Sequence, residues 1–252
     1  ELGASAIAGV YYMTFFMIAF GFSLGAQIIM GRRNGEGNYE RIGPIFYKGT
    51  LFLLGVALVL FVCSYFVSPV LLARFIGSPH VYEAAMSYIH WRVYGFFFAF
   101  VAVMFRAFFV GTTQTKTLTL NSVAMVLSNV VFNYILVFGK LGFPAMGIAG
   151  AAIGSSLAEL VSLVFFIVYT RLRVDVRKYG LNRFGWHEGD SLRHILNTSV
   201  WTMIQNFVSM STWFLFFIAV EHLGERSLAI TNIIRNVSAL PFMIVITFAS
   251  TC

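Results

Sequence analysis

The sequence predicts an all-α integral membrane protein, and three observations lead to that prediction. Of the 252 residues, 59% are apolar and only 11% are charged, and the mean hydropathy is +0.82. This composition leaves too little polar surface for a water-facing globule. The apolar residues also form long, continuous runs, whereas a helix needs roughly 20 residues to cross the hydrocarbon core. Because lipid cannot satisfy free backbone groups, each run is expected to be a transmembrane helix.

Seven apolar segments follow one another along the chain. Their predicted bounds are Gly3–Met30, Gly49–Ala73, Ser87–Val110, Leu118–Phe138, Met146–Thr170, Ile195–Val220 and Leu228–Cys252. Each segment ends where a short polar break with turn residues begins, in the order Gly31–Lys48, Arg74–Met86, Gly111–Thr117, Gly139–Ala145, Arg171–His194 and Glu221–Ser227. No linker marks a soluble domain, so seven transmembrane helices with short connections are expected.

Basic residues are distributed unevenly between alternate breaks. One side carries 12 of them, namely Arg32, Arg33, Arg41, Lys48, Arg106, Lys116, Arg171, Arg173, Arg177, Lys178, Arg183 and Arg193. The other side carries four, namely Arg74, Arg92, Lys140 and Arg226. The positive-inside rule places the richer side in the cytoplasm and the amino end of this chain outside. The net charge of +7 therefore indicates topology, and no nucleic-acid partner is expected.

The ends of the chain and a weak internal repeat suggest a part of a longer transporter. Residue 1 is a glutamate, and the last apolar segment stops at Cys252 without a polar flank, so we expect truncation at both ends. At an offset of 226 residues, Phe16-Met17-Ile18 in the first segment matches Phe242-Met243-Ile244 in the seventh. A repeated half of this kind is common in transporters.

Three stretches together resemble one known family. They are Gly21–Gly37, Phe105–Lys116, and Asn129–Tyr134 running into Gly142–Ala152. In this order and spacing they are similar to the multidrug and toxic compound extrusion (MATE) family, whose superfamily also contains polysaccharide-lipid flippases. The resemblance covers nearly the whole chain. It implies twelve helices in two lobes of six, of which the seven segments here are helices two to eight.

This resemblance divides the chain into three parts. Residues 1–172 are expected to form an incomplete amino-terminal lobe with five transmembrane helices. Residues 173–194 are expected to form a cytoplasmic loop between the lobes, and residues 195–252 the first two helices of the carboxy-terminal lobe. By this alignment the first helix and the last four are absent.

The resemblance also implies a function. Family members export organic cations and drugs across the bacterial inner membrane while a proton or sodium ion moves inward, so the expected partners are such compounds and the lipid bilayer. No cofactor beyond the coupling ion is expected, and a monomer is expected. In one branch, two polar positions on the fifth helix and a hydroxyl on the sixth belong to the cation site. Asn129, Asn133 and Ser155 match these positions, although Asn133 stands where that branch has an acid.

The residues themselves point to the same region. Asn129 and Asn133 are four apart and share one helix face, which must face protein or water because an amide pair in lipid is costly. Glu159 is the only acid deep in an apolar segment, and Ser155 precedes it by one turn. Loss of water disfavours a charged carboxylate, as proton exchange near neutral pH requires. Interhelical hydrogen bonding for the amides, and a cavity-lining role for Glu159, are the alternatives.

Further polar residues lie in the last two segments. These candidates for the cleft between the lobes are Gln205, Asn206, Asn232 and Arg235. An equal alternative is that they fix contacts between helices.

Other function classes fit the sequence less well. A lipid-linked saccharide flippase would favour a strongly cationic cavity, whereas few of the deep residues are basic. A seven-helix receptor or sensor would favour an intact chain with polar flanks at both ends. Neither a nucleophile with a paired base nor a cluster of metal ligands is apparent, so no enzyme and no metal site are expected.

Overall fold

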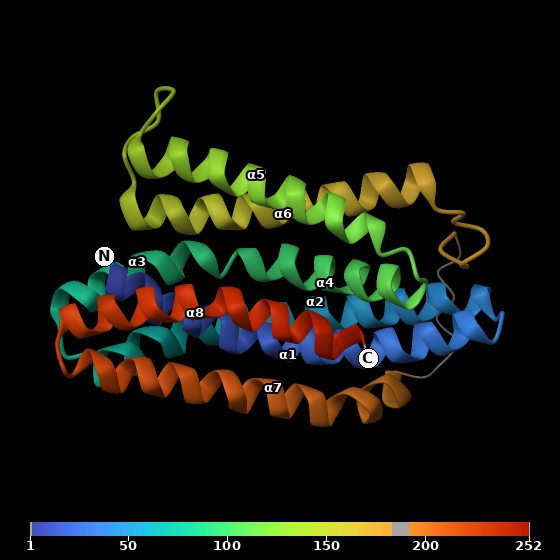
Figure 1. Ribbon diagram of the computed structural model, residues 1–252, viewed down its shortest axis with the longest axis horizontal. Helices are drawn as coiled ribbons and strands as arrows, with labels where there is room; N and C mark the ends of the chain where they lie inside the picture. Colours follow the sequence, from blue (N-terminus) through green and yellow to red (C-terminus); the bar gives the residue numbers. More distant parts are fainter. Residues whose placement is uncertain (1, 183–191, 252) are drawn as a thin grey trace.

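The structure is a computed structural model that describes residues 2–182 and 192–251, and within these ranges it contains helices but no strand. The helices are α1 (Leu2–Gly35), η1 (Tyr39–Arg41), α2 (Ile42–Phe75), α3 (Pro79–Arg92), α4 (Gly95–Gly111), α5 (Lys116–Phe138), α6 (Gly147–Arg173), α7 (Leu192–Glu221) and α8 (Glu225–Thr251) (Figure 1). The predicted all-α membrane fold is therefore confirmed.

Most of the predicted spans are present as single long helices. Among the described residues, α1, α2, α5, α6 and α7 are each long and apolar enough to cross a membrane. The bent pair α3 and α4 passes the same test as one broken span. The seventh predicted span corresponds to the helix α8.

The third predicted span differs from the expected single helix that begins at Ser87. It starts earlier, at Pro79, because proline suits the first helical position and the Ser78 side chain accepts a hydrogen bond from the backbone N–H of Val81 at 3.5 Å. After Arg92 the helix breaks, and α4 continues from Gly95 at an angle of 55° to α3. The residues from Pro79 to Arg92 thus reach from one surface into the interior of the bundle.

The helices lie side by side along the long axis of the molecule, with α4 between the pair α5–α6 and the group that contains α1 and α7 (Figure 1). The most extensive packing joins α1 to α7, and the next joins α5 to α6. Aromatic side chains fill much of the core. Among its fully buried residues are Phe22, Phe96, Phe100, Phe108 and Phe109. This packing holds α1, the α3–α4 break and α6 together.

Glycines allow α1 and α7 to approach closely. A Cβ atom on Gly21 would lie 2.6 Å from Cα of Met203, and one on Gly25 would lie 2.8 Å from Cβ of Ser199. The hydroxyl of Ser199 donates a hydrogen bond to the carbonyl of Phe22 on α1 at 3.2 Å. The two helices are therefore in backbone contact, as small residues permit in membrane proteins.

The chain after α6 folds back onto the start of α2. The N–H of Gly43 donates to the carbonyl of Tyr179 at 2.8 Å, and the Tyr47 hydroxyl donates to the carbonyl of Leu181. This segment is the first part of the predicted inter-lobe loop, of which residues 183–191 lie outside the described residues. The division into lobes stays a prediction.

Candidate functional site

A buried ion pair joins the end of α3 to the middle of α6. Arg92 donates from Nη1 to Oε2 of Glu159 at 2.8 Å and from Nη2 to Oε1 at 2.5 Å, so the contact is bidentate. Only 8% of Arg92 and 9% of Glu159 are exposed. The deep acid of the sequence is therefore paired with a buried cation.

Two further side chains complete what we call the charged cluster, which consists of Tyr12, Arg92, Ser156 and Glu159. The Tyr12 hydroxyl donates to both carboxylate oxygens of Glu159 at 3.2 Å. Its ring lies under the guanidinium of Arg92, 3.7 Å from the ring centroid. Arg92 also donates to the Ser156 hydroxyl at 3.4 Å. A buried pair is tolerated only when such extra hydrogen bonds satisfy its remaining polar atoms.

The charged cluster lies deep in the predicted membrane. At 1.5 Å per residue, Glu159 is roughly 18 Å from the start of α6 and Arg92 roughly 20 Å from the start of α3. The break between α3 and α4 follows directly, at Val93 and Tyr94. A Cβ atom on Gly95 would clash with Nη1 of Arg92 and lie 2.5 Å from Oε2 of Glu159. Glycine at this position therefore makes room for the ion pair.

The structure brings the three motif-matched residues together in what we call the amide cluster, formed by Asn129, Asn133 and Ser155. Asn129 Nδ2 donates to the Ser155 hydroxyl at 3.3 Å, and Asn133 Nδ2 donates to Asn129 Oδ1 at 3.0 Å. Within the described part of the chain, the buried Oδ1 of Asn133 has no hydrogen-bond partner. The cluster therefore keeps an oxygen that can accept a further bond.

The two clusters use neighbouring positions of α6. Ser155 is one turn from Glu159 but contacts Asn129 on α5, the residue with which the family resemblance groups it. The hydroxyl that joins the charged cluster is that of the next residue, Ser156. The reason is that α6 packs against α5 as well as against α3 and α4, so neighbouring positions face different helices.

A cavity of about 310 Å³ adjoins the charged cluster. Glu159 and Asn121 contribute polar atoms to its wall, while Phe16 and Phe166 contribute aromatic surface. Asn121 donates from Nδ2 to the Ser162 hydroxyl at 2.9 Å, and its buried Oδ1 lacks a partner among the described residues. A mostly apolar cavity with a few directed polar atoms has the character of a small-molecule site.

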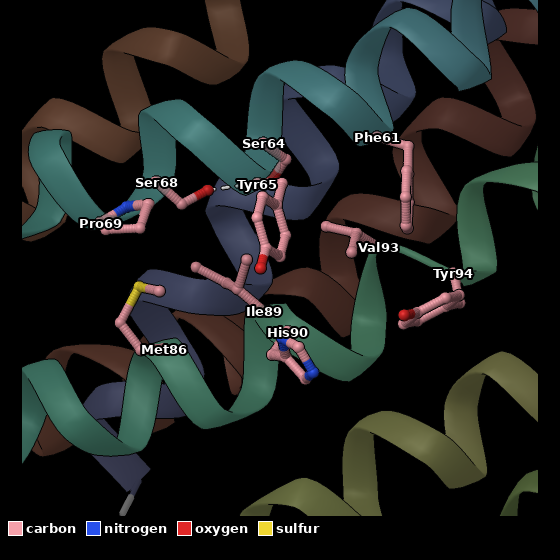
Figure 2. A pocket seen from close by; sticks show the side chains of 10 residues that line it. All are labelled: Phe61, Ser64, Tyr65, Ser68, Pro69, Met86, Ile89, His90, Val93 and Tyr94. Atoms are coloured by element: carbon pink, nitrogen blue, oxygen red, sulfur yellow. Dashed lines mark hydrogen bonds between the residues drawn. The ribbon is translucent and has the colours of Figure 1, made fainter.

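A separate cavity, also of about 310 Å³, lies between α2 and α3. Figure 2 shows Phe61 and Tyr65 on α2 facing Ile89 and His90 on α3 across it. It shares no residue with either cluster and is therefore distinct from the candidate site.

The four predicted cleft residues have different surroundings. Asn232 is buried and accepts a hydrogen bond from Arg235 Nη2 at 3.2 Å, while the Arg235 guanidinium lies 4.9 Å from the ring centroid of Phe217. Gln205 is exposed. Asn206 is part-buried, and within the described residues its Nδ2 has no partner. Their assignment to a cleft stays a prediction.

Sequence reasoning did not identify Arg92, Tyr12 or Gly95. A span that begins at Ser87 puts Arg92 among the outer charges, whereas the helix begins at Pro79. Counting from Pro79 places this arginine 13 residues inside the helix, and a deep acid needs a counter-charge. The signal in the sequence was thus the Ser78-Pro79 helix start. Among the described residues, no group of three or more His, Cys, Asp or Glu is placed to hold a metal ion.

Known proteins are similar to this chain in sequence. The chain is 24% identical over 249 residues to "Probable multidrug resistance protein NorM" of Photorhabdus laumondii, a match that covers 97% of this chain and 53% of that protein. It is 26% identical over 250 residues to "Probable multidrug resistance protein YoeA" of Bacillus subtilis, which covers 94% and 53%. The chain thus spans about half the length of the curated relatives it matches.

Solved structures share the fold. An inward-facing multidrug resistance MATE family transporter matches with a TM-score of 0.79 at 17% identity, covering 94% of this chain and 53% of that one. An outward-facing one also matches with a TM-score of 0.79, at 18% identity and with 94% and 52% covered. The MatE family profile matches residues 1–135, which is more than half of the chain. The chain therefore belongs to the MATE family.

Proposed function

We propose that the protein is a secondary-active exporter of organic cations or drugs in the bacterial inner membrane. The relatives named as multidrug resistance proteins support the substrate class. The observation that carries the proposal is a deep cavity with Glu159 in its wall and the amide cluster on the same helix pair. Intramembrane polar groups of this kind mark substrate and ion pathways.

The two clusters offer two ways to couple export to an ion. The amide cluster provides neutral oxygen atoms, including the unpaired Oδ1 of Asn133 within the described residues, and hard cations bind to such oxygens. Glu159 can exchange a proton when its pairing with Arg92 opens during alternating access. The first route couples to sodium and the second to protons.

The test is efflux by the complete gene product in vesicles on which a proton or a sodium gradient is imposed separately. With Glu159→Gln we expect loss of proton-driven efflux, with insertion and substrate binding measured alongside because Arg92 then lacks its carboxylate partner. The double variant Arg92→Gln/Glu159→Gln removes both charges and controls for an unpaired arginine. Glu83→Gln, an exposed acid on α3, is the matched control. If the glutamine variant at 159 pumps like the parent, Glu159 does not couple export.

The same vesicle system tests the amide cluster. Asn129→Ala and Asn133→Ala are expected to weaken sodium-driven efflux more than an exposed replacement on the same helix, such as Val130→Ala. Unchanged sodium dependence in both variants would reduce the amide cluster to a packing contact.

Orientation is a part of the proposal that labelling can test. We expect Gly31–Lys48 in the cytoplasm and Arg74–Met86 outside. In a variant without Cys63 and Cys252, a cysteine at His80 should react with an impermeant reagent added outside intact cells, and one at Asn34 should not. The opposite pattern would reverse the topology.

The cavity does not favour the flippase alternative. Arg106 is the basic residue in its wall, and the same wall contains the acid Glu159. Binding of a saccharide-phosphate substrate would favour several basic side chains in the cavity wall. Membership of the MATE family also disagrees with a seven-helix receptor.

A further inference from the structure

A third cavity, of about 390 Å³, lies at the opposite end of α6 from the amide cluster. It is formed by α2, α4, α6 and the segment that follows α6. Thr170 in its wall is 11 residues beyond Glu159, or roughly 16 Å further along α6. The cavity is thus at the predicted cytoplasmic surface, away from both clusters.

The inner part of this cavity is apolar. Phe46 and Phe108 are buried and form its aromatic floor between α2 and α4. Ile167, on α6, is 36% exposed and lies where the cavity meets the outside of the bundle. In a membrane this opening faces hydrocarbon, so an acyl chain is the occupant that the lining suits.

The outer edge of the cavity is polar. Thr170 is only 9% exposed, and its hydroxyl has no hydrogen-bond partner among the described residues. Arg171 follows it, is exposed and lines the same cavity. In the part of the chain that the structure describes, no ion pair includes Arg171. A hydroxyl donor and a guanidinium therefore lie side by side above the apolar floor.

The segment that closes the cavity is basic. Residues 171–181 contain Arg171, Arg173, Arg177 and Lys178 but one acid, Asp175. The carboxylate of Asp175 already accepts hydrogen bonds from the backbone N–H groups of Arg177 and Lys178 at 3.0 and 3.1 Å. Tyr47 holds the segment in place through the carbonyl of Leu181. The basic residues of this segment therefore place positive charge at the polar edge of the cavity.

We propose that this cavity binds one anionic phospholipid of the cytoplasmic leaflet. Its acyl chain fills the aromatic floor, an ester carbonyl accepts the hydrogen bond of Thr170, and the phosphate pairs with Arg171. A phospholipid presents these three groups in the same order, from the hydrocarbon core to the surface. Basic pockets between helices on the cytoplasmic side are recognised by anionic head groups, and guanidinium groups pair well with phosphate.

Native mass spectrometry of the complete gene product in mild detergent tests this proposal. The probes are phosphatidylglycerol, phosphatidylcholine with the same acyl chains, and glycerol 3-phosphate, which carries the head-group phosphate alone. We expect one phosphatidylglycerol to be retained preferentially and glycerol 3-phosphate not to displace it. Equal retention of the two phospholipids, or displacement by glycerol 3-phosphate, would overturn the proposal.

Variants locate the site. Arg171→Gln is expected to weaken phosphatidylglycerol retention about fivefold, since one basic residue near an anionic lipid contributes about that factor. Arg173→Gln is the matched control, because Arg173 is also exposed but does not line the cavity. Ile167→Trp should block the opening and lower retention without any change in charge. If Arg171→Gln and Arg173→Gln reduce retention equally, diffuse attraction to the basic segment explains binding and the site is refuted.

Discussion

The charged cluster and the amide cluster share α6 but differ in how their buried polar groups are satisfied. In the charged cluster, Glu159 takes up hydrogen bonds from Arg92 and Tyr12, and three helices contribute to the contact. In the amide cluster, α5 and α6 contribute alone, and the Oδ1 of Asn133 has no partner within the described residues.

The difference follows from the cost of desolvation. A buried charge without a partner costs several kcal/mol of folding free energy, so each charge in the charged cluster needs its partner. Hydrogen bonds between neutral side chains in membranes contribute only about 0.6 to 2 kcal/mol, so an amide can remain partly unsatisfied at small cost. The charged cluster therefore fixes helices, and the amide cluster retains free capacity to accept a ligand.

The largest effect is expected from breaking the ion pair. Arg92→Gln leaves Glu159 buried without its cation and should destabilise the folded protein by about 3–5 kcal/mol. The double variant Arg92→Gln/Glu159→Gln should recover most of that loss. Unfolding by heat or denaturant in detergent measures the stability of both variants. If the single variant is as stable as the double one, the pairing does not stabilise the fold.

A smaller effect is expected from crowding the same cluster. Gly95→Ala places a methyl group where Arg92 and Glu159 meet, and overpacking of this kind costs about 1–3 kcal/mol. Gly55→Ala on α2 is the control, because its added Cβ would have no atom within 4 Å. Equal unfolding temperatures for the two alanine variants would show that the charged cluster adapts without strain.

Substitutions in the amide cluster should lower the stability of the fold less than those in the charged cluster. Asn133→Ala removes one hydrogen bond to Asn129 and is expected to cost under about 2 kcal/mol. The same unfolding measurement, with Val130→Ala as the exposed control, compares it directly with Arg92→Gln. A loss as large as that of the ion-pair variant would show that the amide cluster is as rigid as the charged one.

The smallest effect is expected at an exposed ion pair. Hydrogen bonds from Arg33 and Arg32 lower the pKa of Glu36 from 4.5 to about 2. The lowered pKa means that any stabilisation is present above pH 4.5 and is lost as the pH falls toward 2. Because solvent screens this pair, Glu36→Gln should leave the unfolding temperature at pH 7 unchanged. A clear decrease in the unfolding temperature would mean that this surface ion pair stabilises the fold as the buried one does.

The sequence was sufficient for the helices and for part of the candidate site. Long apolar runs specify membrane helices whatever their neighbours, and the spacing of Asn129 and Asn133 places both on one face. The partner of Glu159 could not be identified in this way, because Arg92 and Tyr12 are 67 and 147 residues away along the chain. Only the packing of α1, α3 and α6 brings them together.

The contact at the carboxy-terminal end of α7 has a consequence for mutational tolerance. The buried carboxylate of Glu221 accepts hydrogen bonds from the backbone N–H groups of Gly77 and Ser78 at 3.1 and 3.0 Å. These donors belong to the main chain and remain after almost any substitution at positions 77 and 78, proline excepted. The acceptor is the side chain of Glu221, so a substitution at this one position removes it. A substitution of Glu221 therefore removes both hydrogen bonds, whereas a substitution of Gly77 leaves its backbone donor in place.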